Sequence, residues 1–222
     1  MAILLNIDTA TDIASVSIAE NGKVLVFKEN AIQKDHATFL HPAIQNILQQ
    51  AEMDINQLNA IAVTGGPGSY TGLRVGMASA KGLCYALNKP FICINTLEAM
   101  ALSGIMHHPN SEYCYCPMID ARRMEVFTAL YKNNLQNIVP ASAIVLSEQF
   151  LQNELLNNHI VFFGSGAEKW KKIVNHSNCI FWEQSNLYKA LAQLSFEKFF
   201  ENNFTELAHS QPFYAKEFYN GG

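Results

Sequence analysis

Charged residues are scarce in this sequence, and they form no cluster of one sign. Of the 222 residues only 15% are Asp, Glu, Lys or Arg, while 49% are apolar. That balance excludes a chain disordered by self-repulsion and indicates a globular protein. The formal net charge is −4, and the sequence lacks the clustered Lys and Arg residues with which proteins hold a nucleic-acid backbone. We therefore expect a partner to supply the positive surface if RNA is bound.

Long apolar runs and paired cysteines are also missing. No run approaches the roughly 20 residues of a membrane span, and Met1 to Asn6 has no basic stretch or long apolar core of a signal peptide. The five cysteines show no two-residue gap typical of a zinc knuckle or a thioredoxin site. We expect reduced thiols in a cytoplasmic protein, with Cys114 and Cys116 on one face of a core strand.

The apolar periodicity predicts two α/β lobes with mixed sheets. The expected boundaries are residues 1–102 and 103–222, with the joint near Leu97 to Met106. The predicted strands are 3–7, 14–19, 23–28, 60–64, 91–95, 113–119, 125–131 and 159–163. The predicted helices are 35–51, 73–87, 147–156, 167–174 and 187–200. Asp35 is expected to cap the first of these helices.

A glycine-rich segment, Gly65 to Gly76, joins a predicted strand to a predicted helix. Such a loop can turn backbone amides toward a phosphate, or it can simply form a tight turn. A Walker loop needs a lysine and a hydroxyl residue after its last glycine, but Gly72 is followed by Leu73 and Arg74. Both interpretations remain open. The Ser69 environment is also unlike a nucleophile elbow.

The histidines do not have the spacing of metal ligands. His36 and His41 are five residues apart, which rotates the second by about 140° around a helix relative to the first. The other five, His107, His108, His159, His176 and His209, show no ligand spacing. Arg122 and Arg123, which follow Asp120 closely, could grip a phosphate or a carboxylate, or they could be ordinary exposed charges.

Several segments together resemble one family. Gly66 to Gly76 reads GPGSYTGLRVG and resembles the GPGSFTGLRIG motif of the TsaB/YeaZ family. Further segments are similar to that family in the same order: Asp8 to Thr11, His36 with Leu40 and Pro42, Thr96 to Ala99, Met118 to Val126, and Pro212 to Tyr214. The resemblance is strong from Asp8 to Met100 and weaker from Asn133 to Ser210.

This resemblance implies a two-lobed actin-like (ASKHA) fold and a role in tRNA modification. The family member would be a non-catalytic subunit of the complex that makes threonylcarbamoyladenosine beside the anticodon of tRNAs that read codons beginning with A. Its expected partners are a TsaD-like catalytic subunit and a TsaE-like ATPase, with a homodimer when alone and tRNA reached through the complex. No cofactor of its own is expected, because ATP and metal would lie on the partner subunits.

The resemblance also places the sites. The docking surface would be formed by the helices near 36–51 and 71–87, where small residues at Gly72, Gly76, Ser79 and Gly82 could admit another helix or pack inside their own lobe. The interface residues are His36, Phe39, Ala43, Thr71, Gly72, Arg74, Gly76 and Ser79. Gly76→Leu is expected to block docking and leave the chain folded. Residues that could face a nucleotide, or only form turns, are Asp8, Thr9, Gly66, Gly68, Gly164 and Gly166.

Two other functions remain open. One is a free-standing actin-like ATPase or sugar kinase, which would bind ATP and magnesium as an isolated chain. The other is a metallopeptidase, which would carry metal as purified. We predict no catalytic residue and no metal ligand in this chain.

Overall fold

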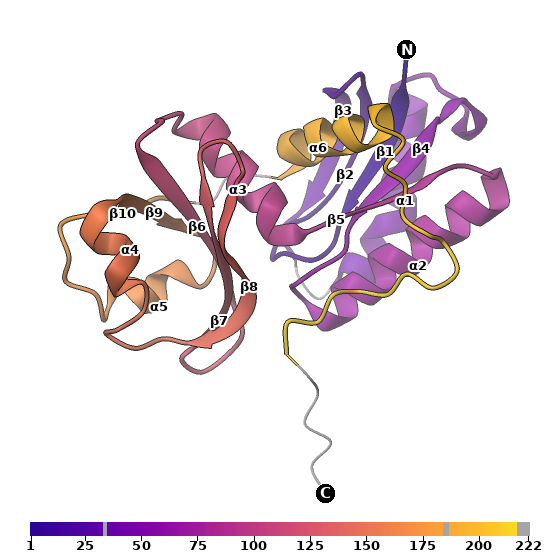
Figure 1. Cartoon of the computed structure of the whole chain (residues 1–222). Coiled ribbons are helices and arrows are strands. Elements are labelled where there is room, and N and C mark those ends of the chain that lie inside the picture. The colour runs from indigo at the N-terminus through magenta and orange to yellow at the C-terminus, as the bar shows by residue number, and fades with distance from the viewer. Residues whose placement is uncertain (33–34, 184–186, 217–222) are drawn as a thin grey trace, which may run out of the picture. The chain divides into compact units, whose positions relative to one another are not determined.

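The computed structural model describes residues 1–32, 35–183 and 187–216. These form two compact units. The first contains Met1–Ala99 and residues 187–213, and the second contains residues 100–183 and 214–216. Each unit has a five-stranded mixed sheet with helices (Figure 1), and each is described here by itself.

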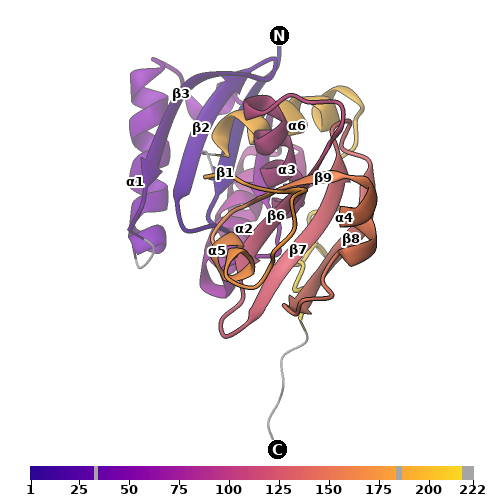
Figure 2. The same cartoon turned by 90° about the vertical axis from the view of Figure 1, so that its left-hand side faces the viewer.

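The sheet of the first unit has the order β3-β2-β1-β4-β5. The antiparallel strands are β1 (Ile3–Asp8), β2 (Ala14–Glu20) and β3 (Lys23–Asn30), and β4 (Ala60–Thr64) and β5 (Phe91–Ile94) run parallel to β1. A short 3-10 turn, Ile55–Gln57, precedes β4. The helices are α1 (His36–Gln50), α2 (Tyr70–Leu87) and α6 (Tyr188–Phe200). Figure 2 shows α1 alongside β2 and β3.

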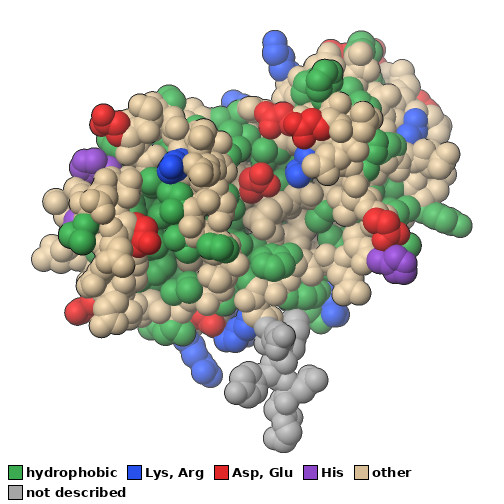
Figure 3. All heavy atoms as spheres, viewed as in Figure 1, with side chains coloured by type: hydrophobic (Ala, Val, Ile, Leu, Met, Phe, Trp, Pro, Cys, Tyr) green, Lys and Arg blue, Asp and Glu red, His purple; other side chains and the backbone are tan. Residues whose placement is uncertain are grey.

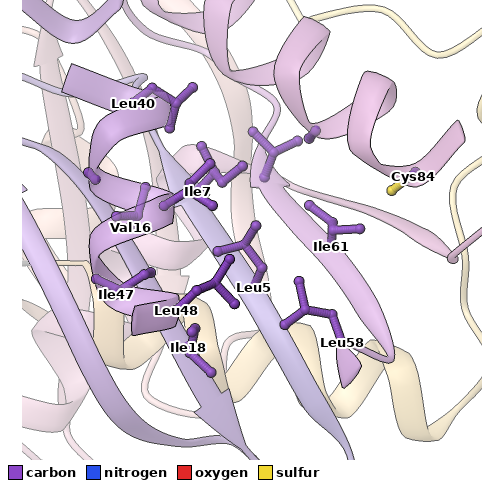
Figure 4. Close-up of a cluster of buried hydrophobic side chains, with 14 of the residues drawn as sticks. Leu5, Ile7, Val16, Ile18, Leu40, Ile47, Leu48, Leu58, Ile61 and Cys84 are labelled. Atoms are coloured by element: carbon purple, nitrogen blue, oxygen red, sulfur yellow. The ribbon is translucent and has the colours of Figure 1, made fainter. Parts of the chain in front are cut away.

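Apolar side chains between the sheet and α1 form the main core of this unit. Leu5 and Ile7 of β1 point toward Leu40 and Ile47 of α1 (Figure 4), and all four are completely buried. Full burial of one such side chain is worth about 1.5–3 kcal/mol. The periodicity of α1 was therefore predicted correctly, although Asp35 makes no side-chain capping bond.

The opposite face of the same sheet is covered by α6. Ser195 of α6 donates a hydrogen bond to Asn6 of β1 over 2.5 Å. Beyond α6 the chain runs past β5 and α2 (Figure 1): Thr205 N donates to Phe91 O over 2.8 Å, and Lys81 Nζ donates to Ser210 O over 3.0 Å. The predicted second lobe, 103–222, is thus wrong for residues 187–213, because periodicity locates a helix without showing which sheet it covers.

The second unit has the strand order β10-β9-β6-β7-β8. Its strands are β6 (Tyr113–Asp120), β7 (Glu125–Lys132), β8 (Asn137–Val145), β9 (His159–Phe163) and β10 (Cys179–Phe181). Its short helices are α4 (Gln152–Asn157) and α5 (Ala167–Lys171). Trp170 lies buried in its core together with Cys114 and Cys116, which share one face of β6 as predicted.

Besides the short 3-10 turn, one helix and two strands of the structure were not predicted. The helix α3 (Thr96–His107) occupies the segment expected to be a joint, and the first unit ends inside it. The strands β8 and β10 were missed. In addition, α2 begins three residues earlier than expected, because the Ser69 side chain accepts a bond from Gly72 N over 3.3 Å and caps the helix.

Candidate functional site

The glycine-rich loop is held by hydrogen bonds to its own unit. Gly65 N donates to Ile94 O over 2.8 Å, Gly66 N donates to the Thr96 hydroxyl over 3.1 Å, and Ser69 N donates to Ala10 O over 2.8 Å. These three amides are already satisfied, so a phosphate could use them only by displacing protein partners. This arrangement favours the tight-turn interpretation of the loop.

The glycines of this loop allow backbones to approach closely. A Cβ at Gly66, where φ is 112°, would overlap Phe213 O, and a Cβ at Gly68 would overlap Ala10 O. Any larger residue would push these segments apart. Gly66 and Gly68 are thus explained by the packing of the chain itself, and the nucleotide contact expected for them stays a prediction.

Gly72 and Gly76 lie on the inner face of α2, where they pack on Thr9. Thr9 Oγ1 donates a hydrogen bond to Gly72 O over 2.7 Å. A Cβ at Gly76 would overlap Thr9 Oγ1 and lie 3.3 Å from Val63 Cγ2. The expectation that Gly76→Leu leaves the chain folded is therefore wrong, since leucine would be forced into the core of its own unit.

The other predicted docking residues divide between the core and the surface. His36 and Ala43 are buried inside the first unit and Phe39 is partly buried against its core, whereas Thr71 and Arg74 are exposed and Ser79 is half-buried. His41 Nε2 lies 3.1 Å from Ser79 Oγ, which brings α1 and α2 side by side. Four of the predicted docking residues are therefore buried and can affect a docking surface only by holding its exposed residues in place: His36, Ala43, Gly72 and Gly76.

Exposed positions recur every three or four residues on both helices. We call this surface the outer α1–α2 surface; it consists of Thr38, His41, Gln45 and Gln49 of α1 and Thr71, Arg74, Ala78, Gly82 and Tyr85 of α2. Tyr85 is 83% exposed, and nothing lies within 4 Å of a Cβ built at Gly82. Sequence reasoning missed Ala78 and Tyr85, although their spacing from Arg74 is a helical signal.

The two histidines of α1 point to different partners. His36 Nε2 lies 3.1 Å from Thr11 O in the interior, while His41 is exposed beside Ser79. Among residues 1–32, 35–183 and 187–216, no three His, Cys, Asp or Glu side chains gather closely enough to hold a metal ion. His36 and His41 are thus engaged at two different places, one inside the first unit and one on its surface.

Asp8 is buried at the end of β1, and its carboxylate is fully engaged. It accepts hydrogen bonds from Thr64 Oγ1 at 2.6 Å, from Thr11 Oγ1 at 2.9 Å and from Ala10 N at 3.0 Å. Burial raises the pKa of Asp8, and these hydrogen bonds and the nearby His36 oppose that rise. Asp8 and Thr9 therefore fix the turn after β1 and the start of α2; their predicted contact with a nucleotide is untested.

Gly164 and Gly166 make a comparable tight turn in the second unit. Gly166 N donates to Met118 O over 2.9 Å, and a Cβ at Gly164, where φ is 97°, would overlap the same oxygen. These glycines let the segment after β9 approach β6. Whether they also face a nucleotide stays a prediction.

Burial disfavours the thiolate form of three of the five cysteines. Burial raises the pKa of Cys84 and of Cys116 to about 12 and that of Cys179 to about 11. Near neutral pH these groups stay protonated, and the thiolate is the nucleophilic form. They act as core residues.

Neither a basic patch on the face shown in Figure 3 nor a membrane-spanning helix is found in the described part of the chain. On the face shown in Figure 3, Lys and Arg side chains lie scattered among acidic and apolar ones. Across the parts of the chain that the structure describes, every helix is too short or too polar to cross a membrane.

Comparison with known sequences identifies the family. Residues 29–208 match the family model described as TsaD, tRNA N6-adenosine threonylcarbamoyltransferase. The TsaB protein of Escherichia coli (strain K12), named a tRNA threonylcarbamoyladenosine biosynthesis protein, is 28% identical over 220 residues, covering 96% of this chain and 94% of that protein. TsaB of Bacillus subtilis (strain 168) is 29% identical over 174 residues, covering 77% and 74%.

Comparison with solved structures establishes the fold. A Pseudomonas aeruginosa protein described as similar to the peptidase YeaZ has a TM-score of 0.85 at 21% identity, covering 97% of this chain and 100% of that one. An Arthrobacter polyphosphate/ATP-glucomannokinase has a TM-score of 0.52 at 10% identity, covering 90% and 100%. The predicted actin-like fold is thus confirmed. The chain belongs to the TsaB/YeaZ family of tRNA threonylcarbamoyladenosine biosynthesis proteins, within the group matched by the threonylcarbamoyltransferase model.

Proposed function

We propose that this chain is the non-catalytic scaffold subunit of a tRNA N6-adenosine threonylcarbamoyltransferase complex, and that it binds a TsaD-like catalytic subunit through the outer α1–α2 surface. A TsaE-like ATPase completes the complex, and the same surface pairs two copies of the chain when the catalytic subunit is absent. ATP and metal are bound by the partners, and tRNA is reached through the assembled complex in the cytoplasm.

The observation that carries this proposal is the position of Tyr85. Its side chain is 83% exposed on α2, one helical turn from Gly82, whose Cβ position is open. Large aromatic side chains that become buried dominate the energetics of protein interfaces, and small neighbours allow a partner helix to approach closely. Tyr85 beside Ala78 and Gly82 offers both features.

The buried polar groups of the first unit support a structural role. Each carboxylate oxygen of Asp8 is occupied by the turn that it holds, and Thr9 Oγ1 is occupied by Gly72 O. The amides of Gly65 and Gly66 are bonded to Ile94 and Thr96. These groups explain how the turn after β1 and the glycine loop seat the N-terminal end of α2, the helix that would dock.

Co-purification of two leucine variants tests the proposal. Gly82→Leu places a large side chain on the outer surface, where nothing of the same chain lies within 4 Å. The variant should fold as the wild type does and lose the complex with the TsaD-like subunit on size-exclusion chromatography. Gly76→Leu is the comparison variant: leucine there disturbs the fold itself, so it shows how the complex is lost through misfolding, which circular dichroism detects.

The activity of the reconstituted complex tests whether this chain is needed for tRNA modification. Threonylcarbamoyladenosine formation from the purified subunits should require this chain and should be lost with Gly82→Leu. A folded Gly82→Leu variant that still forms an active complex would exclude the outer α1–α2 surface as the interface. Stoichiometric ATP binding by the isolated chain in calorimetry would instead support an ATPase.

A further inference from the structure

The turn between β6 and β7 carries two adjacent arginines. The chain has only three arginines, Arg74, Arg122 and Arg123, and the last two are exposed in this turn. In the described part of the chain, neither guanidinium lies within 4.0 Å of a carboxylate. Two adjacent cations of this turn thus have no ion-pair partner among residues 1–32, 35–183 and 187–216.

The backbone of this turn is strained at both arginines. Their φ angles are 70° and 48°, in the left-handed region. Consecutive positive φ values in a hairpin normally select Asn, Asp or Gly, and a side chain that persists there needs support from its surroundings. Each arginine therefore carries a backbone cost that an Asn or a Gly at the same position would largely avoid.

Hydrogen bonds hold the turn in this conformation. Arg122 N donates to Asp120 Oδ1 over 2.6 Å, and Glu125 N donates to Arg122 O over 3.0 Å. Lys169 Nζ lies 2.7 Å from the same Asp120 oxygen and 3.2 Å from Glu125 O. The backbone that carries the two guanidinium groups is therefore fixed in advance.

The acidic residues beside the turn are neutralised by lysines. Asp120 pairs with Lys169, and Glu125 pairs with Lys216 at 2.6 Å. Because each flanking carboxylate has its own cation, Arg122 and Arg123 are the charged residues of the segment 120–125 that make no ion pair within the described part of the chain. An anion that binds the two arginines therefore does not face an unpaired carboxylate at Asp120 or at Glu125.

We propose that the Arg122–Arg123 turn binds phosphate groups of the RNA backbone. This inference rests on the proposed function, in which the complex takes tRNA as its substrate. The guanidinium fork matches phosphate oxygens in two-point hydrogen bonds, which lysine cannot do. Contacts to phosphate position an RNA without reading its sequence. The turn supplies a small, fixed contact on a chain whose net charge is −4.

An acidic protein segment is the competing ligand. Met124, the next residue in the turn, is 42% exposed, and arginine and methionine are both enriched in protein interfaces. The phosphate is favoured because two arginines are adjacent in one short turn, and because the flanking carboxylates Asp120 and Glu125 are each paired with a lysine. The experiment separates these two ligands.

Salt-dependent RNA binding by the reconstituted complex tests the inference. An unmodified tRNA transcript that reads a codon beginning with A is titrated with complexes containing the wild-type chain or Arg122→Ala/Arg123→Ala. Each phosphate contact contributes about 0.7–0.9 to the slope of log affinity against log salt. The double variant should therefore have a slope shallower by about 1.4–1.8 and an affinity lower by about 25- to 60-fold at 0.1 M salt.

Lys171→Ala/Lys172→Ala is the matched control. It removes the same charge from two adjacent exposed residues at the end of α5, and its slope should stay near that of the wild type. An unchanged slope for the arginine variant, or an equal loss for both variants, would overturn the proposal. Loss of complex assembly with RNA binding intact would overturn it in favour of an acidic protein. Modification activity of the wild-type complex is measured separately. Its absence would count against the proposed function, whereas the salt slope of the arginine variant tests the RNA contact alone.

Discussion

Replacing glycine by alanine is expected to have opposite effects at two positions of α2. At Gly82 nothing lies within 4 Å of the new Cβ, whereas at Gly76 it would overlap Thr9 Oγ1. In an exposed helix interior alanine is favoured over glycine by about 1 kcal/mol. Gly82→Ala should therefore raise the free energy of unfolding by about that amount.

At Gly76 the same helical preference is outweighed by packing. Forcing an extra methyl group into a close-packed site costs about 1–3 kcal/mol. Displacing Thr9 also weakens its 2.7 Å bond to Gly72 O, a loss of about 1 kcal/mol for a buried pair. Set against the gain of about 1 kcal/mol in helix propensity, the net destabilisation is about 1–3 kcal/mol.

Thermal unfolding of the full chain measures both variants. One kcal/mol corresponds to about 2–4 °C in Tm for a chain of this size, so Gly82→Ala should melt higher than the wild type and Gly76→Ala lower. Far-ultraviolet circular dichroism follows the transition. Fluorescence of Trp170 and Trp182, which both lie in the second unit, reports whether that unit is undisturbed. If both variants shift Tm in the same direction, the assignment of inner and outer faces of α2 is wrong.

Two other predictions concern a buried carboxylate and a strained turn. Because burial raises the pKa of Asp8 above 3.8, the folded state binds the proton more tightly than the unfolded state, and stability falls as the pH rises from about 3.8 through the raised value. Asp8→Asn should therefore gain stability relative to the wild type over that pH range in urea titrations, and a difference independent of pH would refute the assignment. Arg122→Gly/Arg123→Gly should relieve two left-handed backbone conformations and raise the free energy of unfolding by about 1 kcal/mol or more; a drop in urea stability would show that the arginines are not strained.

The sequence predicted most elements that have a clear period. Leu40, Ile44, Ile47 and Leu48 fall on one face of α1 and are buried there. By contrast, α3 is apolar almost all round and gives no periodic signal. The strand β8 lies at a sheet edge and contains Pro140, and β10 has only three residues. Such segments look like loops because neither alternation nor length marks them.

The candidate site was predicted only in part, for a geometric reason. Ten residues separate Gly72 from Gly82, and at about 100° per residue the second glycine is turned about 80° from the first. The predicted stripe of small residues therefore winds around α2, with Gly72 and Gly76 inside and Gly82 outside. Sequence spacing shows that residues share a helix, but the face that meets the sheet is decided by Thr9 and Val63, which belong to distant segments.

Residues 187–213 pack on the first sheet although they follow most of the second unit in the chain. The first unit can therefore be completed only late in synthesis. During synthesis, β1 to β5 leave the ribosome long before α6, so α6 cannot cover its side of their sheet until residues 100–183 of the second unit have been made. Most of the second unit, residues 100–183, is thus inserted between two parts of the first unit. A chain cut after residue 102 would lack α6, and the face of the first sheet that α6 covers would be exposed to water.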